Sequence, residues 1–171
     1  MKKIAFLDRD GTINRDYPDE QWRYVKQPEF LDGAIKGMKK LLENGYEIII
    51  VTNQYIIHDG IITMEDYSAY TEKFLTELSQ NGIEILHIYF CPHNDADGCH
   101  CKKPKPGMIE QALLDYEIEL SASIYCGDSE ADYLLAKQFE LPFYGINYAG
   151  AQNDVIHCGG LLEACTKASL A

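Results

Sequence analysis

The chain has 171 residues, 46% of them hydrophobic and 25% charged, which is the composition of a folded globular protein with room for one core. Its formal net charge is −12, and this acidity argues against general binding to nucleic acid or to anionic membranes, because both need a basic surface. A small anionic substrate stays compatible with the charge if positive side chains gather at one site.

The N-terminal stretch MKKIAFLDRD holds only four apolar residues, Ile4–Leu7, before the next charge. That run is too short for the core of a signal peptide. No stretch of the chain approaches the roughly 20 apolar residues that cross a bilayer. We therefore expect a cytoplasmic protein with no membrane partner. We also expect a monomer, although the sequence leaves an oligomer open.

Five short apolar runs are the predicted strands, and several are continuous rather than alternating, as in strands that are covered on both faces. These runs are Ile4–Leu7, Tyr46–Val51, Ile85–Phe90, Ser123–Cys126 and Phe143–Ile146. Apolar residues at helical spacing lie between and after them. The predicted helices run through Ala34–Leu42, from the Thr63–Asp66 capping box to Gly82, over Gly107–Tyr116, through Ala131–Phe139 and over Gly160–Leu170.

The alternation of strands and helices predicts an α/β fold, a single Rossmann-like three-layer domain over residues 1–171. We expect an open, mostly parallel sheet with helices on both faces, no cap domain, and an inserted loop at 91–101. In such sheets, ligands bind beyond the carboxyl ends of the strands. The residues that follow each strand are therefore the candidates for a functional site.

Polar residues follow each of the first four predicted strands. They are Asp8-Arg9-Asp10-Gly11-Thr12, Thr52-Asn53-Gln54, Cys91-Pro92-His93 and Gly127-Asp128-Ser129-Glu130-Ala131-Asp132. Asp8, Asp10 and Asp128 offer the hard oxygen ligands that Mg²⁺ prefers, and Mg²⁺ in proteins typically also binds substrate phosphate. Taken singly, Asp10 and Asp128 are also explained as turn or helix-cap residues. Polar groups that converge at four strand ends favour a site.

Four candidate metal ligands lie in the stretch CPHNDADGCHC. The pattern Cys-x-His-x5-Cys-x-Cys suits tetrahedral Zn²⁺ and leaves no open position for catalysis. The ligands are Cys91, His93, Cys99 and Cys101. We therefore expect a structural zinc site, the alternative being free cysteines in a flexible loop. His100 ranks below His93 as a ligand. The other cysteines are expected in the core or at the surface: Cys126 (core), Cys158 and Cys165.

The ordered motifs resemble those of the haloacid dehalogenase-like phosphatases. They are Asp-x-Asp-Gly-Thr after an apolar strand, Thr-Asn after a second strand, a later lysine, and Gly-Asp-x-x-x-Asp after a further strand. The resemblance covers the chain from Met1 to about Ile146. It implies an enzyme that hydrolyses phosphomonoesters through an aspartyl-phosphate intermediate.

The resemblance also implies a role for individual residues. Asp8 would be the nucleophile, Asp10 the general acid and then the base, and Thr52 a donor to the phosphoryl oxygens. Lys103 would neutralise Asp8 and the phosphoryl group. Asp128 would bind Mg²⁺ together with Asp8 and the backbone carbonyl of Asp10. These roles are chemically coherent, because attack by a carboxylate on a phosphate dianion requires their repulsion to be cancelled.

Two neighbouring positions have more than one interpretation. Asp132 is either a side chain that orients a catalytic group or a first-turn carboxylate favoured by the helix dipole. The basic run after the zinc loop contains Lys102, Lys103 and Lys105. We expect Lys105 to be exposed, and Lys103 to be held beside the phosphate by the metal-bound loop.

The cysteine loop narrows the resemblance to a zinc-containing branch, which holds D-glycero-D-manno-heptose 1,7-bisphosphate phosphatases and histidinol-phosphate phosphatases. The short gap between His93 and Cys99 looks more like the histidinol enzymes, whereas Lys103–Met108 and Gln54–Thr63 look more like the heptose enzymes. Both groups usually carry arginine where this chain has Lys102. Since lysine cannot form the bidentate hydrogen bonds that arginine makes to phosphate, we expect a second phosphate to be held weakly or not at all.

Substrate selection is expected to come from the loops Asp16–Gln27 and Gln54–Ile62 and from the zinc loop. Trp22 and Tyr24 are candidates to stack on a sugar or imidazole ring, although packing against the sheet edge is favoured for Trp22. The further candidates for substrate binding are Asn53, Gln54 and Lys102.

The leading hypothesis is a Mg²⁺-dependent hydrolase for a small phosphorylated metabolite, with D-glycero-D-manno-heptose 1,7-bisphosphate as the best candidate. The alternatives are a histidinol-phosphate phosphatase, a phosphatase for polynucleotide 3′ ends, and a zinc-stabilised binding module without catalysis. The acidic balance counts against polynucleotides as partners. The presence of Asp8, Asp10, Lys103 and Asp128 counts against an inactive module.

Overall fold

The computed structural model describes all 171 residues, arranged around a six-stranded sheet in which every pairing is parallel. The strands are β1 (Ile4–Leu7), β2 (Glu47–Asn53), β3 (His87–Cys91), β4 (Ile124–Gly127), β5 (Phe143–Ile146) and β6 (Val155–Cys158). Their order is β3-β2-β1-β4-β5-β6, so the chain changes direction across the sheet between β1 and β4. This switch point is where open α/β sheets bind ligands.

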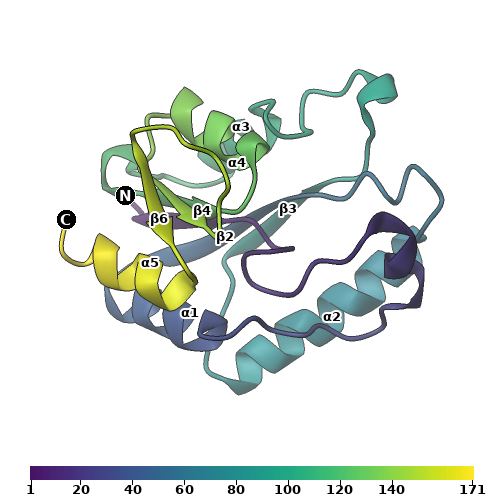
Figure 1. Ribbon diagram of the computed structural model, residues 1–171, viewed down its shortest axis with the longest axis horizontal. Coiled ribbons are helices and arrows are strands. Elements are labelled where there is room, and N and C mark those ends of the chain that lie inside the picture. Colours follow the sequence, from purple (N-terminus) through teal and green to yellow (C-terminus); the bar gives the residue numbers. More distant parts are fainter.

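Five α-helices cover the two faces of the sheet (Figure 1). They are α1 (Ala34–Glu43), α2 (Met64–Gln80), α3 (Gly107–Asp115), α4 (Glu130–Gln138) and α5 (Leu161–Ala168). Helices α3 and α4 lie on one face, and α1, α2 and α5 lie on the other. The predicted α/β fold with helices on both faces is therefore confirmed. None of the helices has the length and apolar character needed to cross a membrane.

Strand β1 illustrates why both faces are covered. Successive side chains of a strand point to opposite faces of the sheet, and in β1 both sets are apolar. Ala5 and Leu7 pack into the core beneath α1, α2 and α5, whereas Ile4 and Phe6 pack into the core beneath α3 and α4. A strand that is buried on both sides reads in the sequence as an uninterrupted apolar run.

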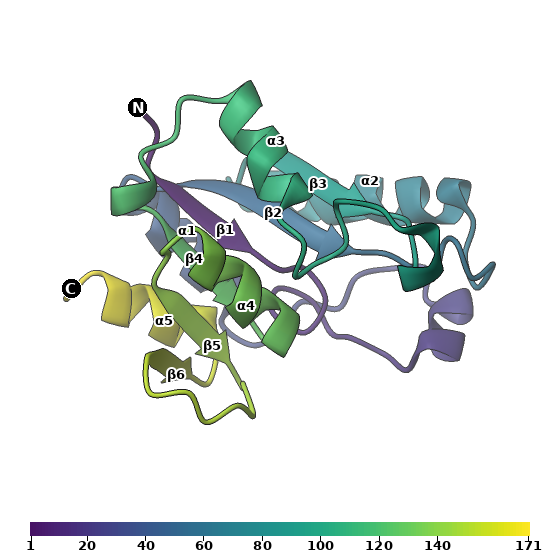
Figure 2. The ribbon, with the colours of Figure 1, turned by 90° about the horizontal axis from the view of Figure 1, so that it is seen from above.

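Strands β2 and β3 extend past the apolar runs that predicted them. Their ladder continues to the pair Asn53 and Cys91, because backbone hydrogen bonds do not require apolar side chains. A predicted substrate-binding residue and a predicted zinc ligand therefore lie opposite each other on neighbouring strands. Figure 2 shows that the loops after β1 and β3 lie at the same edge of the sheet.

The sequence pattern did not predict the edge strand β6. It has four residues, and its third residue, His157, is exposed, so the strand lacks a continuous apolar run. The five predicted helices are all present. The predicted capping box at the start of α2 is also confirmed, because Asp66 N–H donates to Thr63 Oγ1 (3.0 Å) and Thr63 N–H donates to Asp66 Oδ2 (2.9 Å).

Helices α1 and α5 approach each other closely at Gly37. A Cβ atom at this position would lie 2.6 Å from the carbonyl carbon of Leu161 and 2.7 Å from the backbone nitrogen of Leu162. Both atoms belong to the backbone of α5 and cannot move aside as a flexible side chain would. The contact between α1 and α5 therefore requires glycine at position 37.

We expect the Gly37→Ala variant to lose about 1–2 kcal/mol of the free energy of unfolding, because overpacking against α5 outweighs the higher helix propensity of alanine. Urea denaturation followed by circular dichroism measures this loss. Lys39→Ala, on the exposed face of α1, is the control and should leave the unfolding midpoint nearly unchanged. A Gly37→Ala protein as stable as the wild type would show that α5 tolerates the extra carbon.

Candidate active site and cysteine–histidine cluster

A cavity of about 290 Å³ opens at the edge of the sheet where the carboxyl ends of β1, β2 and β4 meet. Most of the residues that the sequence singled out line it: Asp8, Asp10, Thr52, Asn53, Gln54, Lys103 and Asp128. Lys102, Tyr24 and Asp132, which the sequence also singled out, do not line the cavity. The fold thus brings together side chains from four separate segments of the chain.

Lys103 lies buried at the base of this cavity, and its ammonium group makes three hydrogen bonds. Nζ donates to Asp8 Oδ1 (2.8 Å), to Asp132 Oδ1 (2.7 Å) and to the Val51 carbonyl (2.8 Å). Burial alone would lower the pKa of Lys103, but the Asp132 and Asp8 carboxylates outweigh it and raise the pKa above its ordinary value. The ammonium group therefore stays charged beside Asp8.

Asp132 combines the two interpretations that the sequence left open. It is fully buried, and its Oδ1 accepts hydrogen bonds from Lys103 and from the Tyr125 hydroxyl (2.6 Å). Its Oδ2 accepts from the backbone N–H and hydroxyl of Ser129, which is the N-cap of α4. Asp132 is therefore both a first-turn carboxylate of a capping box and the side chain that orients Lys103.

Asp8 and Asp128 face each other at the cavity wall, and the ligand oxygens of Asp8, Asp128 and Asp132 lie within 4.8 Å of one another. Burial, and then the Asp132 carboxylate, raise the pKa of Asp8 well above its usual range, while Lys103 opposes this. Burial is also the main cause that raises the pKa of Asp128 to about 6. Because the oxygens of Asp132 are already engaged, Asp8 and Asp128 are the carboxylates that fit a divalent cation.

Gly11 permits this approach of Asp128 to the loop after β1. Its φ of +85° is in the left-handed region, and a Cβ atom at this position would lie 2.0 Å from Asp128 Oδ2. Any other residue would therefore displace the Asp128 carboxylate from its place opposite Asp8.

The Asp10 carboxylate accepts four N–H groups. Arg9 donates through Nε to Oδ1 (2.7 Å) and through Nη2 to Oδ2 (3.0 Å). Asn14 Nδ2 donates to Oδ1 (3.0 Å), and Gln54 Nε2 donates to Oδ2 (3.0 Å). The sequence did not single out Arg9 or Asn14, and its only hint was the place of Arg9 between two aspartates.

The three residues after the apolar run of β2 differ in what they contact. Gln54 Nε2 also donates to Thr52 Oγ1 (3.0 Å), and both side chains lie at the cavity. Asn53 instead pairs with the backbone of Lys103, since its Oδ1 accepts from Lys103 N–H (2.8 Å) and its Nδ2 donates to the Lys103 carbonyl (3.2 Å). The amide of Asn53, predicted to bind substrate, thus holds the lysine segment in place.

Trp22, Tyr24 and Lys102 lie in different surroundings in the structure. Trp22 is buried, lines the cavity, and packs edge-on against Tyr70. Tyr24 is 77% exposed and does not line the cavity, so the structure does not bring it to the site. Lys102 Nζ donates to Asp95 Oδ1 (2.9 Å) and lies 4.8 Å from the ring centre of Tyr55.

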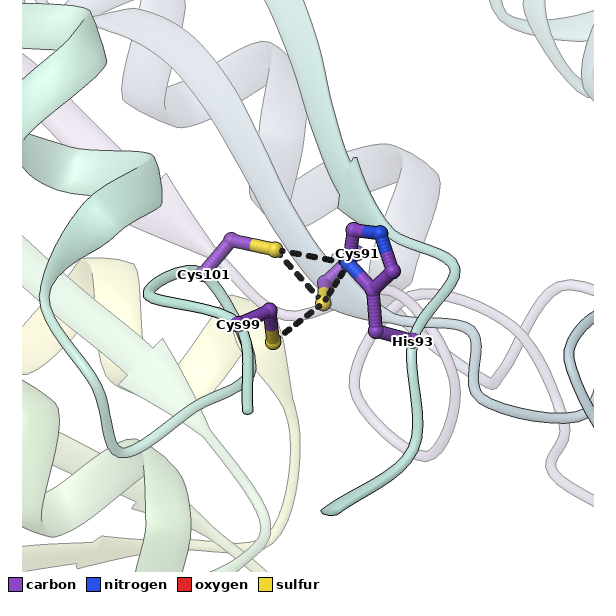
Figure 3. A group of neighbouring side chains, drawn as sticks. All are labelled: Cys91, His93, Cys99 and Cys101. Carbon is purple, nitrogen blue, oxygen red and sulfur yellow. Dashed lines mark hydrogen bonds between the residues drawn. The ribbon is translucent and has the colours of Figure 1, made fainter. Parts of the chain in front are cut away.

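The predicted zinc ligands form a compact cluster (Figure 3). Their ligand atoms lie within 4.8 Å of one another: Cys91 Sγ, His93 Nδ1, Cys99 Sγ and Cys101 Sγ. The Sγ atoms of Cys91 and Cys99 are 3.7 Å apart, close to the roughly 3.8 Å edge of a tetrahedron with zinc–sulfur bonds of about 2.3 Å. The sulfurs of Cys91 and Cys101 are closer, at 2.7 Å, and a metal ion would move them apart.

The surroundings favour the charged thiolate of Cys99, whereas burial raises the pKa of Cys91 and of Cys101. Burial raises the pKa of Cys99, but the backbone N–H groups of Lys102 and Cys101 outweigh it and lower the pKa to about 6. His100 lies outside the cluster and pairs with Glu110 (2.8 Å), in agreement with its lower rank as a ligand.

One expectation about this loop is wrong. Lys105 was expected to be exposed, but it is half-buried and its Nζ donates to the Cys99 carbonyl (2.7 Å). A long side chain that folds back on its own loop satisfies a carbonyl that the turn leaves free. The cysteines outside the cluster, Cys126, Cys158 and Cys165, are all buried, as expected of small core residues.

Comparison with known protein families gives a match over most of the chain. The family model described as "Polynucleotide kinase 3 phosphatase" matches residues 3–151. Two relatives are each 38% identical to this chain and match 82% of it. One is the D-glycero-alpha-D-manno-heptose-1,7-bisphosphate 7-phosphatase of Photorhabdus laumondii, and the match covers 79% of its length. The other is the probable D-glycero-D-manno-heptose-1,7-bisphosphate 7-phosphatase of Thermoplasma volcanium, and the match covers 96% of its length.

A solved structure is similar over nearly the whole chain. It is the crystal structure of D,D-heptose 1,7-bisphosphate phosphatase from B. bronchiseptica complexed with magnesium and phosphate. The TM-score is 0.87 at 26% sequence identity, and the match covers 99% of each chain.

The buried position of Asp132 predicts a large effect of its charge on stability. We expect Asp132→Asn to lose about 3 kcal/mol of the free energy of unfolding, because Lys103 loses a buried partner, although relief of repulsion at Asp8 offsets part of the loss. Urea denaturation without added metal measures the effect.

Asp154 provides a matched control, because it also contacts a lysine and a tyrosine hydroxyl, those of Lys137 and Tyr133, but at the surface. Asp154→Asn should change the unfolding midpoint little. Equal losses in the two variants would contradict the role assigned to the buried Asp132.

Proposed function

We propose that this chain, which belongs to the polynucleotide kinase 3 phosphatase family of haloacid dehalogenase-like phosphatases, hydrolyses a phosphomonoester of a small sugar. The leading candidate substrate is D-glycero-D-manno-heptose 1,7-bisphosphate, with the 7-phosphate removed. The observation that carries this proposal is the contact of the buried Lys103 ammonium with Asp8, opposite Asp128 and at the floor of the cavity.

The names of the relatives favour a heptose bisphosphate over histidinol phosphate. They also favour it over polynucleotide 3′ ends, to which the name of the family model points. The net charge of −12 supports the same choice, because it would repel a polynucleotide backbone. An inactive binding module is disfavoured, because such a module would have no use for the buried Lys103 between two aspartates.

The first chemical step would be an attack by an oxygen of Asp8 on the phosphorus atom. The Asp8–phosphorus bond forms as the bond from phosphorus to the leaving oxygen breaks, and Asp10 passes a proton to that oxygen. Lys103 and the hydroxyl of Thr52 stabilise the charge on the phosphoryl oxygens. In the second step, Asp10 takes a proton from a water molecule whose oxygen bonds to phosphorus. The Asp8–phosphorus bond breaks, which frees the Asp8 carboxylate and inorganic phosphate.

The residues that would hold Mg²⁺ are Asp8, Asp128 and the backbone carbonyl of Asp10. The crowding of Asp8 and Asp128, with the pKa of both raised by burial, fits a divalent cation. Bound there, Mg²⁺ supplies positive charge that offsets the repulsion between the Asp8 carboxylate and the phosphoryl oxygens. The B. bronchiseptica enzyme is described as complexed with magnesium and phosphate, which supports Mg²⁺ as the choice of ion.

The cluster of Cys91, His93, Cys99 and Cys101 would hold Zn²⁺ as a structural ion, which supplies rigidity to the loop when bound. The loop is joined to the segment after β2 by a contact of His58 Nδ1 with Asp97 Oδ2 (2.8 Å) and by a hydrogen bond from Asn94 Nδ2 to Asp59 Oδ1 (3.1 Å). Fixing the loop fixes the backbone of Lys103, which follows it in the chain.

Lys102 is the candidate contact for the second phosphate of the substrate. Its present partner, Asp95, is 89% exposed, and an exposed ion pair is weak. A phosphate that enters near the mouth of the cavity could therefore draw the Lys102 ammonium away from Asp95 at little cost. A lysine forms one point contact rather than the paired contact of an arginine.

Phosphate release tests the proposed nucleophile. We expect Asp8→Asn to lower kcat at least about 10³-fold on heptose 1,7-bisphosphate and on p-nitrophenyl phosphate in the presence of Mg²⁺, because no covalent intermediate can form. Asp154→Asn should retain wild-type activity. Equal phosphate release by wild type and Asp8→Asn would favour a binding module instead.

Metal analysis tests the zinc site. Purified wild-type protein should contain about one zinc per chain, and His93→Gln should contain much less and melt at a lower temperature. His100→Gln removes a neighbouring histidine outside the cluster and should keep the zinc content and the melting temperature. A zinc-free, stable wild-type protein would reject the site.

A further inference from the structure

We propose that Arg9 is a positioning residue for the reaction, because its guanidinium group fixes the orientation of the Asp10 carboxylate and three aromatic rings hold that guanidinium in place. The inference rests on the proposed function, in which Asp10 serves as the general acid for the leaving group. Arg9 does not line the cavity, so it acts through Asp10 rather than on the substrate.

Arg9 is enclosed by aromatic side chains, and only 3% of it is exposed. Its guanidinium carbon lies 4.7 Å from the ring centre of Tyr70, 5.6 Å from that of Trp22 and 5.8 Å from that of Tyr67. Trp22 comes from the turn Asp19–Tyr24, and the two tyrosines come from α2. A cation among three rings is attracted by their negative faces and has little freedom to move.

The hydrogen bonds of the Arg9 side chain both go to Asp10. Because Nε and Nη2 contact separate carboxylate oxygens, at 2.7 and 3.0 Å, they fix the rotation as well as the position of the carboxylate. A lysine has no such paired geometry and would hold one oxygen only.

The other donors divide between the interior and the cavity. Asn14, which is fully buried, donates to the same Asp10 oxygen as Arg9 Nε. Gln54 donates from the cavity side, and its own Oε1 has no hydrogen-bond partner. Arg9 and Asn14 therefore support the Asp10 carboxylate from the interior, and Gln54 supports it from the cavity side.

This support matters for catalysis because a general acid must lie within hydrogen-bond reach of the leaving oxygen, and a small misplacement is costly. The cost depends on the leaving group. An alkoxide requires a proton as it leaves, whereas p-nitrophenolate is stable enough to leave without one. Loss of the Arg9 contact should therefore slow alkyl phosphates more than p-nitrophenyl phosphate.

The experiment compares kcat/KM for glycerol 2-phosphate and p-nitrophenyl phosphate in wild type, Arg9→Lys and Arg15→Lys. The ratio kcat/KM reports the steps up to departure of the leaving group, and the comparison of two substrates is independent of the fraction of active enzyme. We expect Arg9→Lys to lose about 10- to 100-fold more on glycerol 2-phosphate than on p-nitrophenyl phosphate. Arg15→Lys, at an exposed arginine paired with Glu29, should change neither.

Equal losses of Arg9→Lys on both substrates would show that Arg9 is merely structural and would overturn the inference. If Arg9→Lys does not fold, Tyr70→Leu removes the nearest ring and leaves the contacts of Arg9 with Asp10 possible. It should show the same preference in a weaker form, and equal losses would again overturn the inference. Failure of the wild type to release phosphate from heptose 1,7-bisphosphate, or an Asp8→Asn variant as active as the wild type, would reject the proposed function instead.

Discussion

The structure of the site depends on one buried ammonium group. Lys103 is shared between Asp8, which ends up at the tip of β1, and Asp132, which caps the start of α4. A buried charge is tolerable only when it is paired and fully hydrogen-bonded, and Lys103 meets this condition with two carboxylates and a carbonyl. The same contacts tie together segments that are separated by more than ninety residues in the chain.

The cysteine–histidine cluster and the side-chain amide of Asn53 help to fix the position of the Lys103 segment. Lys103 reaches the cavity from a loop rich in glycine, aspartate and proline. Asn53, at the end of β2, holds the backbone of Lys103 on one side, and the cluster gathers the loop that precedes it. The position of the charge is thus set by the sheet edge and not by the loop alone.

The two aspartates of the first motif have opposite surroundings. Asp8 faces other carboxylates, and burial raises its pKa, so it requires positive charge to remain ionised. Asp10 accepts four N–H groups, among them the paired donors of Arg9. Although they are only two residues apart in the chain, Asp8 contacts Lys103, whereas Asp10 contacts Arg9, Asn14 and Gln54. Two side chains of the same type are therefore held by different partners at one end of the cavity.

The sequence alone determined the α/β class, the strand-end positions of Asp8, Thr52 and Asp128, and the four-residue metal pattern. Each of these features follows from the local periodicity of apolar residues or from the spacing of a motif. It did not reveal β6, the support of Asp10 by Arg9 and Asn14, or the contact of Tyr125 with Asp132. Those features join residues that are remote in the chain or depend on the rotation of a side chain. Only the packed tertiary structure decides them, because burial is what forces each polar group to find its partner.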